Sequence, residues 1–160
     1  VFELPIGSKK NSGLPALIKN STKEIKTNFL RGLADTDFSL TFKRKNKKIH
    51  YYPTIDLGSA SSLLIKDVKD LLRELSFRVY YLKRRSQFDK RTGLYYNASK
   101  IDINGVKNLV HWMDNIGFTS QKHLTKYYIW KKYGFCPPYT NIDQRTAILD
   151  GRLDINSFDK

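Results

Sequence analysis

The sequence predicts an α+β fold with the element order αββαββα and one further helix. In this fold two hairpins form a four-stranded antiparallel sheet, and helices pack on one of its faces. Three observations predict it: a capped amphipathic helix near the N-terminus, two segments that alternate apolar and polar residues around a turn, and apolar residues at helical spacing after each of these segments. The 160 residues suffice for one domain with a buried core.

The first predicted helix covers about residues 22–36. Ser21 and Glu24 fit the capping-box pattern, in which a serine hydroxyl and a glutamate three residues on satisfy free backbone N–H groups. Apolar residues recur along it at helical spacing: Ile25, Phe29, Leu30 and Leu33. Gly32 interrupts this face at a cost of roughly 1 kcal/mol against alanine. We therefore expect another backbone, most naturally a second helix, to approach closely at Gly32.

Two carboxylates, Asp35 and Asp37, stand at the far end of this helix. A helix C-terminus carries partial negative charge, so an acid in the last turn costs up to about 1 kcal/mol unless a cation or a capping bond offsets it. The two acids therefore predict a positively charged partner at this place. The plain alternative is that they end the helix and are solvated, as acids before a turn often are.

The first predicted hairpin follows the helix. A strand from Ser39 to Lys45 alternates apolar and polar or cationic residues, residues 46–48 make the turn, and residues 49–57 return. Pro53 has no backbone N–H to donate, so it predicts that the returning strand is irregular or near an edge of the sheet.

The remaining elements follow the same logic. Helices are expected at 61–76, 104–116 and 119–133, the last of them stopped by Gly134 and two prolines. A second hairpin is expected from strand 77–82, a basic connection at 83–91, the turn residues 92–93, and a return at 94–99. This divides the chain into an irregular lead-in (1–20), the domain (21–133) and a C-terminal extension (134–160) that contains a possible short helix.

Composition limits the partners. The net charge of +14 and the pI near 9.8 indicate a polyanionic partner, DNA or RNA. Ribosomal proteins and other RNA-binding proteins without catalytic activity carry a similar excess of positive charge. Residues 134–160 carry a net charge of −1, so the extension is not a basic arm. Because the chain has a single cysteine, it cannot supply the four ligands of a cysteine-rich zinc site, so we expect any metal to be held by oxygen ligands. No membrane-length apolar run and no secretion signal are present, so we expect a soluble, intracellular protein.

The segment from Leu30 to Phe38 resembles the signature of the LAGLIDADG homing endonucleases, with Phe38 where that family usually has glycine. The resemblance implies that Asp37 is a divalent-metal ligand assisted by the Thr36 carbonyl, and that Asp35 is mainly structural. Only one signature is visible, and a one-motif chain of this family pairs with itself. The resemblance therefore implies a homodimer with Phe29, Gly32 and Leu33 at its interface.

The function that the resemblance implies is a metal-dependent, site-specific endonuclease for double-stranded DNA, encoded by a mobile intron. Mg²⁺ is the expected ion, with Mn²⁺ as a substitute and Ca²⁺ as an ion that supports binding without turnover. Lys122 matches the family's catalytic lysine by order, with a plain exposed lysine as the alternative, and Ser59 or Ser61 would complete a water network. The other functions left open are an RNA maturase or DNA-binding regulator on the same scaffold, and a ribosome-associated structural protein.

The sheet face away from the helices is the expected DNA surface, since a two-stranded ribbon fits the major groove. Lysines near the hairpin tips are expected to grip phosphates without reading sequence. The alternative is a solvated lysine-rich face that discourages aggregation. The candidate DNA contacts are Ser39, Thr41, Lys43, Arg44, Lys45, Lys47, Lys48, His50, Tyr52, Thr54, Arg78, Tyr80, Arg84, Arg85, Tyr95, Asn97 and Ser99. The remaining histidines, His111 and His123, are expected in contacts or the core, and Trp112 and Trp130 in packing.

Overall fold

The computed structural model describes residues 12–158, except for the side chains of five residues of the second hairpin (83–85, 87 and 96). The elements, in chain order, are α1 (Ala16–Lys19), α2 (Lys23–Thr36), β1 (Phe38–Lys43), β2 (Tyr52–Ser59), α3 (Ser62–Glu74), β3 (Val79–Asp89), β4 (Leu94–Asn104), α4 (Val106–Asn115), α5 (Gln121–Tyr133), α6 (Ile142–Leu149) and the 3-10 helix η2 (Ile155–Phe158). The predicted α+β fold and element order are confirmed. Residues 1–11 of the predicted lead-in lie outside the described residues; within the remainder, α1 forms a short helix where an irregular segment was expected.

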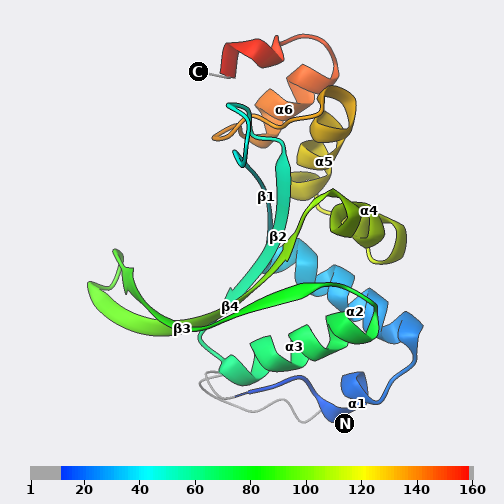
Figure 1. Cartoon of the computed structure of the whole chain (residues 1–160), viewed down its shortest axis with the longest axis vertical. Coiled ribbons are helices and arrows are strands. Elements are labelled where there is room, and N and C mark those ends of the chain that lie inside the picture. The colour runs from blue at the N-terminus through cyan, green and yellow to red at the C-terminus, as the bar shows by residue number, and fades with distance from the viewer. Residues whose placement is uncertain (1–11, 159–160) are drawn as a thin grey trace.

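The four strands form one antiparallel sheet in the order β1-β2-β4-β3. Figure 1 shows helices α2 to α5 on one side of the curved sheet, while the paired ends of β3 and β4 extend away from the helices. The core lies between the two layers, and its largest member, Trp112, packs its ring 5.3 Å from that of Phe38 and 5.6 Å from that of Phe118. Trp130 stacks on Phe42, so both tryptophans serve in packing, as predicted.

The cap of α2 differs from the predicted capping box. Thr22 is the N-cap and its hydroxyl accepts from the Ile25 N–H, whereas the Ser21 hydroxyl donates to the Ile18 carbonyl. The preceding helix α1 explains this, because its last turn provides a nearer acceptor for Ser21. Pro53 stands in an inner strand rather than at an edge, at a position where pairing with β4 has not yet begun, since that register starts at Thr54.

The second hairpin is longer than predicted. Residues 83–89, expected as a basic connection, continue β3, and β4 runs on to Asn104, which was expected to start a helix. A bulge interrupts the register, because three steps on β3 from Leu82 to Arg85 match two on β4 from Lys100 to Ala98. This part of the hairpin projects beyond the helices, so no buried face imposes the apolar alternation by which a strand is recognised.

The longer strand reverses the predicted orientation of one candidate contact, Ser99. Ile101 and Ile103 point into the core, so the odd-numbered positions of β4 lie on the helix side of the sheet. Ser99, which is only 1% exposed, therefore lies on the helix side, whereas Asn97 and Tyr95, nearer the tip of the hairpin, are exposed. Placing Ser99 on the polar face was wrong, because the segment that fixes the alternation had not been read as strand. The DNA contacts of Asn97 and Tyr95 stay predictions.

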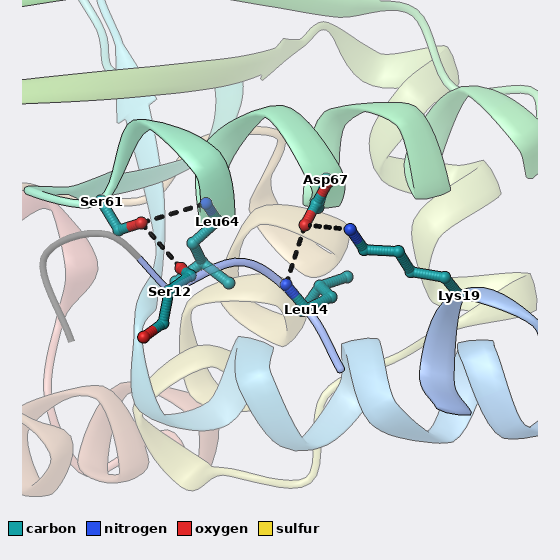
Figure 2. Close-up of polar contacts among 6 residues, drawn as sticks. All are labelled: Ser12, Leu14, Lys19, Ser61, Leu64 and Asp67. Atoms are coloured by element: carbon teal, nitrogen blue, oxygen red, sulfur yellow. Dashed lines mark hydrogen bonds and ion pairs between the residues drawn. The ribbon is translucent and has the colours of Figure 1, made fainter. Parts of the chain in front are cut away.

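The segment before α1 is tied to α3. Figure 2 shows the Ser61 hydroxyl, which caps α3, donating to the Ser12 carbonyl at 2.7 Å, and Asp67 accepting from the Leu14 N–H at 2.8 Å. Lys19 pairs with the same carboxylate at 2.7 Å. A side chain at Gly13 would collide with Asp67, so the glycine permits this close approach. Among the described residues, no helix is both long and apolar enough to cross a bilayer.

Candidate active site and nucleic-acid interface

The carboxylate of Asp35 binds the start of α5. Its Oδ1 lies 3.0 Å from the backbone nitrogen of Thr119 and 2.9 Å from that of Ser120, and the Thr119 hydroxyl donates to Oδ2. Ser120 is the N-cap of α5, and its own side chain makes no capping bond. Asp35 therefore caps α5 from another helix.

This contact supplies the positive partner predicted for the acids of α2. The partner is the N-terminus of α5, whose free N–H groups carry partial positive charge. Burial raises the pKa of Asp35, but the hydrogen bonds from Thr119 and Ser120 outweigh it and lower the pKa below its usual value. Asp35 is thus ionised and structural, and it joins the end of α2 to the start of α5.

Asp37 is exposed at the C-cap of α2, where its N–H donates to the Leu33 carbonyl at 2.9 Å. The Thr36 hydroxyl lies 3.0 Å from Asp37 Oδ2. These oxygens are of the kind that Mg²⁺ prefers, so the residues present fit a hard divalent cation. Within residues 12–158, no three His, Cys, Asp or Glu side chains gather where they could share a metal. Of the two acids at this end of α2, Asp35 is engaged by the start of α5, so Asp37 is the one left exposed.

The face of α2 that leads to Asp37 is open. A Cβ built at Gly32 meets no atom within 4 Å, so the glycine is not required by any contact inside this chain. Ile25, two turns earlier on the same face, is 49% exposed, and Phe29 and Leu33 are half-buried. The close approach predicted at Gly32 is therefore not made within the described chain, and the face is available to a second molecule.

Lys122 is exposed on the first turn of α5, two residues after Ser120. The Asp35 bonds hold this turn at the end of α2, so the chain brings the predicted lysine and the predicted metal ligand to the same region. His123, the next residue, is fully buried against the ring of Phe118. Burial, helped by Lys122 and Lys126, lowers the pKa of His123 to about 4, so it is neutral at pH 7 and belongs to the core, as expected.

The polar face of the sheet carries most of the predicted strand contacts. The registers align Ser39 with Asp56 and Thr41 with Thr54, so these positions share one face. Thr54 is nevertheless fully buried and its hydroxyl donates to Asn104 Oδ1 at 2.9 Å, which removes it from the candidate contacts. The half-buried or exposed candidates on the strands of this face are Ser39, Thr41, Lys43, Tyr52 and Tyr80, with Arg78 stacked on Tyr80 just before β3.

Sequence reasoning missed a charged cluster at the centre of this face. Asp56 and Asp102 are cross-strand partners, and Lys100 Nζ lies 3.1 Å from Asp56 Oδ2 and 3.2 Å from Asp102 Oδ1. Burial lowers the pKa of Lys100, but the two carboxylates outweigh it and raise the pKa above its usual value. The signal was present, because Lys100 and Asp102 alternate with Ile101 and Ile103 once that segment is read as strand.

The connection between β1 and β2 is basic and exposed. Lys45 lies over the ring of Tyr52 and Lys47 over that of Tyr51; Arg44 and Lys48 are exposed beside them. His50, predicted within a strand on the polar face, instead precedes β2, is half-buried, and accepts from the Cys136 N–H at its carbonyl. The predicted contacts of the Arg84 and Arg85 side chains lie outside the described residues.

The two serines proposed for a water network serve other purposes. Ser61 is 3% exposed and is used by the cap of α3 and by Ser12. The Ser59 hydroxyl accepts from the Ser61 N–H, and Ser59 pairs with Ser99 on the helix side of the sheet. The structure gives neither a place beside Asp37 on the polar face.

Fold and site together define a class of protein: an antiparallel sheet with one polar face carrying basic residues, beside a helix that ends in an exposed carboxylate. The chain belongs to the LAGLIDADG family, because the family model described as LAGLIDADG-like domain matches residues 24–117, more than half of its length. No curated protein matches the chain. The family contains homing endonucleases and also maturases that do not cleave, and the matched segment runs from α2 to the end of α4.

Proposed function

We propose that this protein is a homodimeric, metal-dependent endonuclease that cuts double-stranded DNA at a specific site. The observation that carries the proposal is the exposed carboxylate of Asp37 at the end of a helix whose glycine face is open. A protein that only binds nucleic acid gains nothing from an acid directed at phosphates. In this family a chain with one signature is typically encoded by a mobile intron, and we extend that role to this chain.

Dimerisation follows from the face of α2. Gly32 lets a second helix backbone approach, and Ile25, Phe29 and Leu33 supply the apolar surface around it. A twofold axis through this face sets the two Asp37 side chains near each other, because each stands about one turn beyond Leu33, which borders Gly32 on this face. A twofold dimer also favours a DNA target with two related half-sites.

The pair of Asp37 carboxylates, with the Thr36 carbonyls beside them, would hold Mg²⁺. When bound, the ion supplies a nucleophilic water at neutral pH and neutralises charge on the phosphate and on the departing oxygen. Two carboxylates brought together repel unless a cation neutralises them, so Asp37 couples metal binding to assembly. Lys122, held at the same end of α2 by the Asp35 bonds, adds positive charge next to the phosphate.

The DNA surface of each subunit is the polar face of the sheet with its basic connection. We assign major-groove contacts to Ser39, Thr41, Lys43, Tyr52, Arg78 and Tyr80, and phosphate contacts to Arg44, Lys45, Lys47 and Lys48. Helices cover the opposite face, so the polar face is the one that a duplex can reach.

The test is cleavage of a plasmid library with random inserts, followed by sequencing of the cut ends. Wild-type protein should cut a defined site in Mg²⁺ or Mn²⁺ and stop in EDTA. Asp37→Asn should abolish cutting and retain DNA binding in Ca²⁺, while the matched control Asp114→Asn, an exposed acid on α4, should cut normally. Binding of RNA without any metal-dependent DNA cleavage would overturn the nuclease proposal and favour a maturase.

A further inference from the structure

A recess lies between the end of β1 and the C-terminal extension. Its volume is about 530 Å³, and it is lined by residues 41–44 and His50 from the first hairpin, by Lys126 from α5, and by residues 136–140 from the extension. In Figure 1 the segment that precedes α6 runs beside the connection between β1 and β2. The extension thus forms one wall of a site whose other walls belong to the LAGLIDADG domain.

The charge of this recess is entirely positive. Its lining includes Lys43, Arg44 and Lys126 and contains no acidic residue. Lys126 Nζ donates to the Leu40 carbonyl at 2.9 Å, which leaves two of its three protons for another acceptor. A smaller hollow on the polar face of the sheet shares Lys43 and Arg44 with the recess and is also free of acids in its lining. The recess therefore continues the basic surface of the sheet.

The wall supplied by the extension is firmly attached. The Cys136 N–H donates to the His50 carbonyl at 3.0 Å, which joins the extension to the first hairpin. Arg145 of α6 is 3% exposed, and its guanidinium donates to the Thr125 hydroxyl at 2.8 Å and to the Thr140 carbonyl. A capping box between Asn141 and Gln144 fixes the start of α6. The recess is consequently formed before any ligand arrives.

The extension contributes uncharged groups to the recess. Pro137 and Pro138 line it, and the side chain of Tyr139 is fully exposed at its rim. None of the five residues that the extension contributes, 136–140, carries a charge. The hairpin and α5 provide cations, while the extension provides shape and a tyrosine hydroxyl.

We propose that this recess binds the sugar–phosphate backbone of duplex DNA beyond the sheet, so that the C-terminal extension is part of the DNA interface. The inference rests on the DNA binding proposed above. Lys43 lies six residues along β1 from Asp37, so the contact falls roughly 20 Å from the metal ligand. It therefore holds the flank of the target and not the phosphate that is cut. Continuity with the basic face of the sheet is what favours a duplex over a separate ligand.

A cysteine reporter tests where the duplex lies. In Tyr139→Cys the new thiol is exposed, whereas native Cys136 is buried and its pKa is raised to about 11, so it reacts slowly with iodoacetamide. A saturating 40-base-pair duplex should slow labelling of the reporter about tenfold, with binding verified by fluorescence anisotropy. The control reporter Lys107→Cys, exposed on α4, should label at the same rate with and without DNA.

Charge removal gives a second, independent readout. Lys126→Met keeps an unbranched apolar side chain in place of the lysine stem and removes one recess cation; it should weaken duplex binding several-fold and reduce the slope of log K against log salt by about one. Lys107→Gln should change neither. Thermal unfolding verifies that each variant is folded, and Lys126→Gln replaces Lys126→Met if that variant is not.

The outcomes separate the two proposals. If wild-type protein binds no duplex DNA, the proposed function fails and the recess inference fails with it. If the wild type binds DNA but the Tyr139→Cys reporter stays fully reactive and the salt slope does not change, only the recess inference is overturned. Protection of the reporter by single-stranded RNA and not by duplex DNA also overturns it.

Discussion

Oδ1 of Asp35, in the last turn of α2, lies 2.9 Å from the backbone nitrogen of Ser120, the N-cap of α5. The end of one helix and the start of another, more than eighty residues apart in sequence, thus share one carboxylate. The negative end of α2 and the positive end of α5 meet there, so an acid that would be unfavourable on an isolated helix becomes favourable in the folded protein. This contact also sets Lys122 relative to Asp37.

Replacing Asp35 by asparagine should destabilise the protein by about 1–2 kcal/mol, because the uncharged amide is a weaker acceptor for the N–H groups of α5. Urea unfolding monitored by circular dichroism measures the change. Asp114→Asn, which removes an exposed acid that makes no hydrogen bond or ion pair within residues 12–158, is the control and should alter stability by less than about 0.5 kcal/mol. Equal stability of the two variants would contradict the capping role of Asp35.

The stabilisation that Asp35 provides should be lost at low pH. Its pKa is lower in the folded protein than in the unfolded chain, so its contribution is complete above the unfolded value of about 3.9 and is lost as pH falls through the folded value. The stability difference between wild type and Asp35→Asn should therefore be constant above about pH 5 and shrink below pH 4. Urea titrations at intervals between pH 2.5 and 7 measure it.

The sequence predicted the order of elements and the face of β1 because these segments border the core, where burial imposes a period. Leu40 and Phe42 are buried while Thr41 between them is not, and this alternation is legible without a structure. The projecting half of the second hairpin does not pack against the core, so its sequence shows no such alternation. The face of the sheet on which Ser99 lies was consequently predicted wrongly, and the Asp56–Lys100–Asp102 cluster was overlooked.

The candidate site was partly legible for a different reason. Asp35 and Asp37 stood out because their position conflicted with the helix dipole, and that conflict pointed to a partner. The identity of the partner was beyond sequence reasoning, since nothing local marks Thr119 and Ser120 as neighbours of α2. The recess was equally hidden, because it combines residues 41–44 with residues 136–140.

Gly32→Leu should separate dimerisation from folding. No atom lies within 4 Å of a Cβ at Gly32, and leucine has a better helix propensity than glycine by several tenths of a kcal/mol, so the isolated subunit should be at least as stable. The proposed dimer should be lost, because the larger side chain keeps the partner helix away. Sedimentation velocity gives the oligomeric state and thermal unfolding of the monomer gives its stability; a variant that still dimerises would exclude this face as the interface.

Lys100→Met should leave Asp56 and Asp102 facing each other without a cation. Because both carboxylates are mostly shielded from solvent, the repulsion should lower stability by about 1–3 kcal/mol. Adding Asp56→Asn to Lys100→Met should restore part of the loss, which a double-mutant cycle in urea quantifies. A cycle with no coupling would mean that the ion pairs contribute nothing to the sheet.

His123 should make the protein sensitive to mild acid. It is buried as a neutral ring with a pKa of about 4 in the folded protein, against about 6.5 when unfolded, so the unfolded chain binds more protons between these values. Stability is therefore complete above about pH 6.5 and falls as pH drops toward 4, a window that lies above that of Asp35. His123→Leu has no proton to bind, so its unfolding free energy should vary less between pH 7 and 4 than that of the wild type. An unchanged slope in that variant would assign the acid sensitivity to another group.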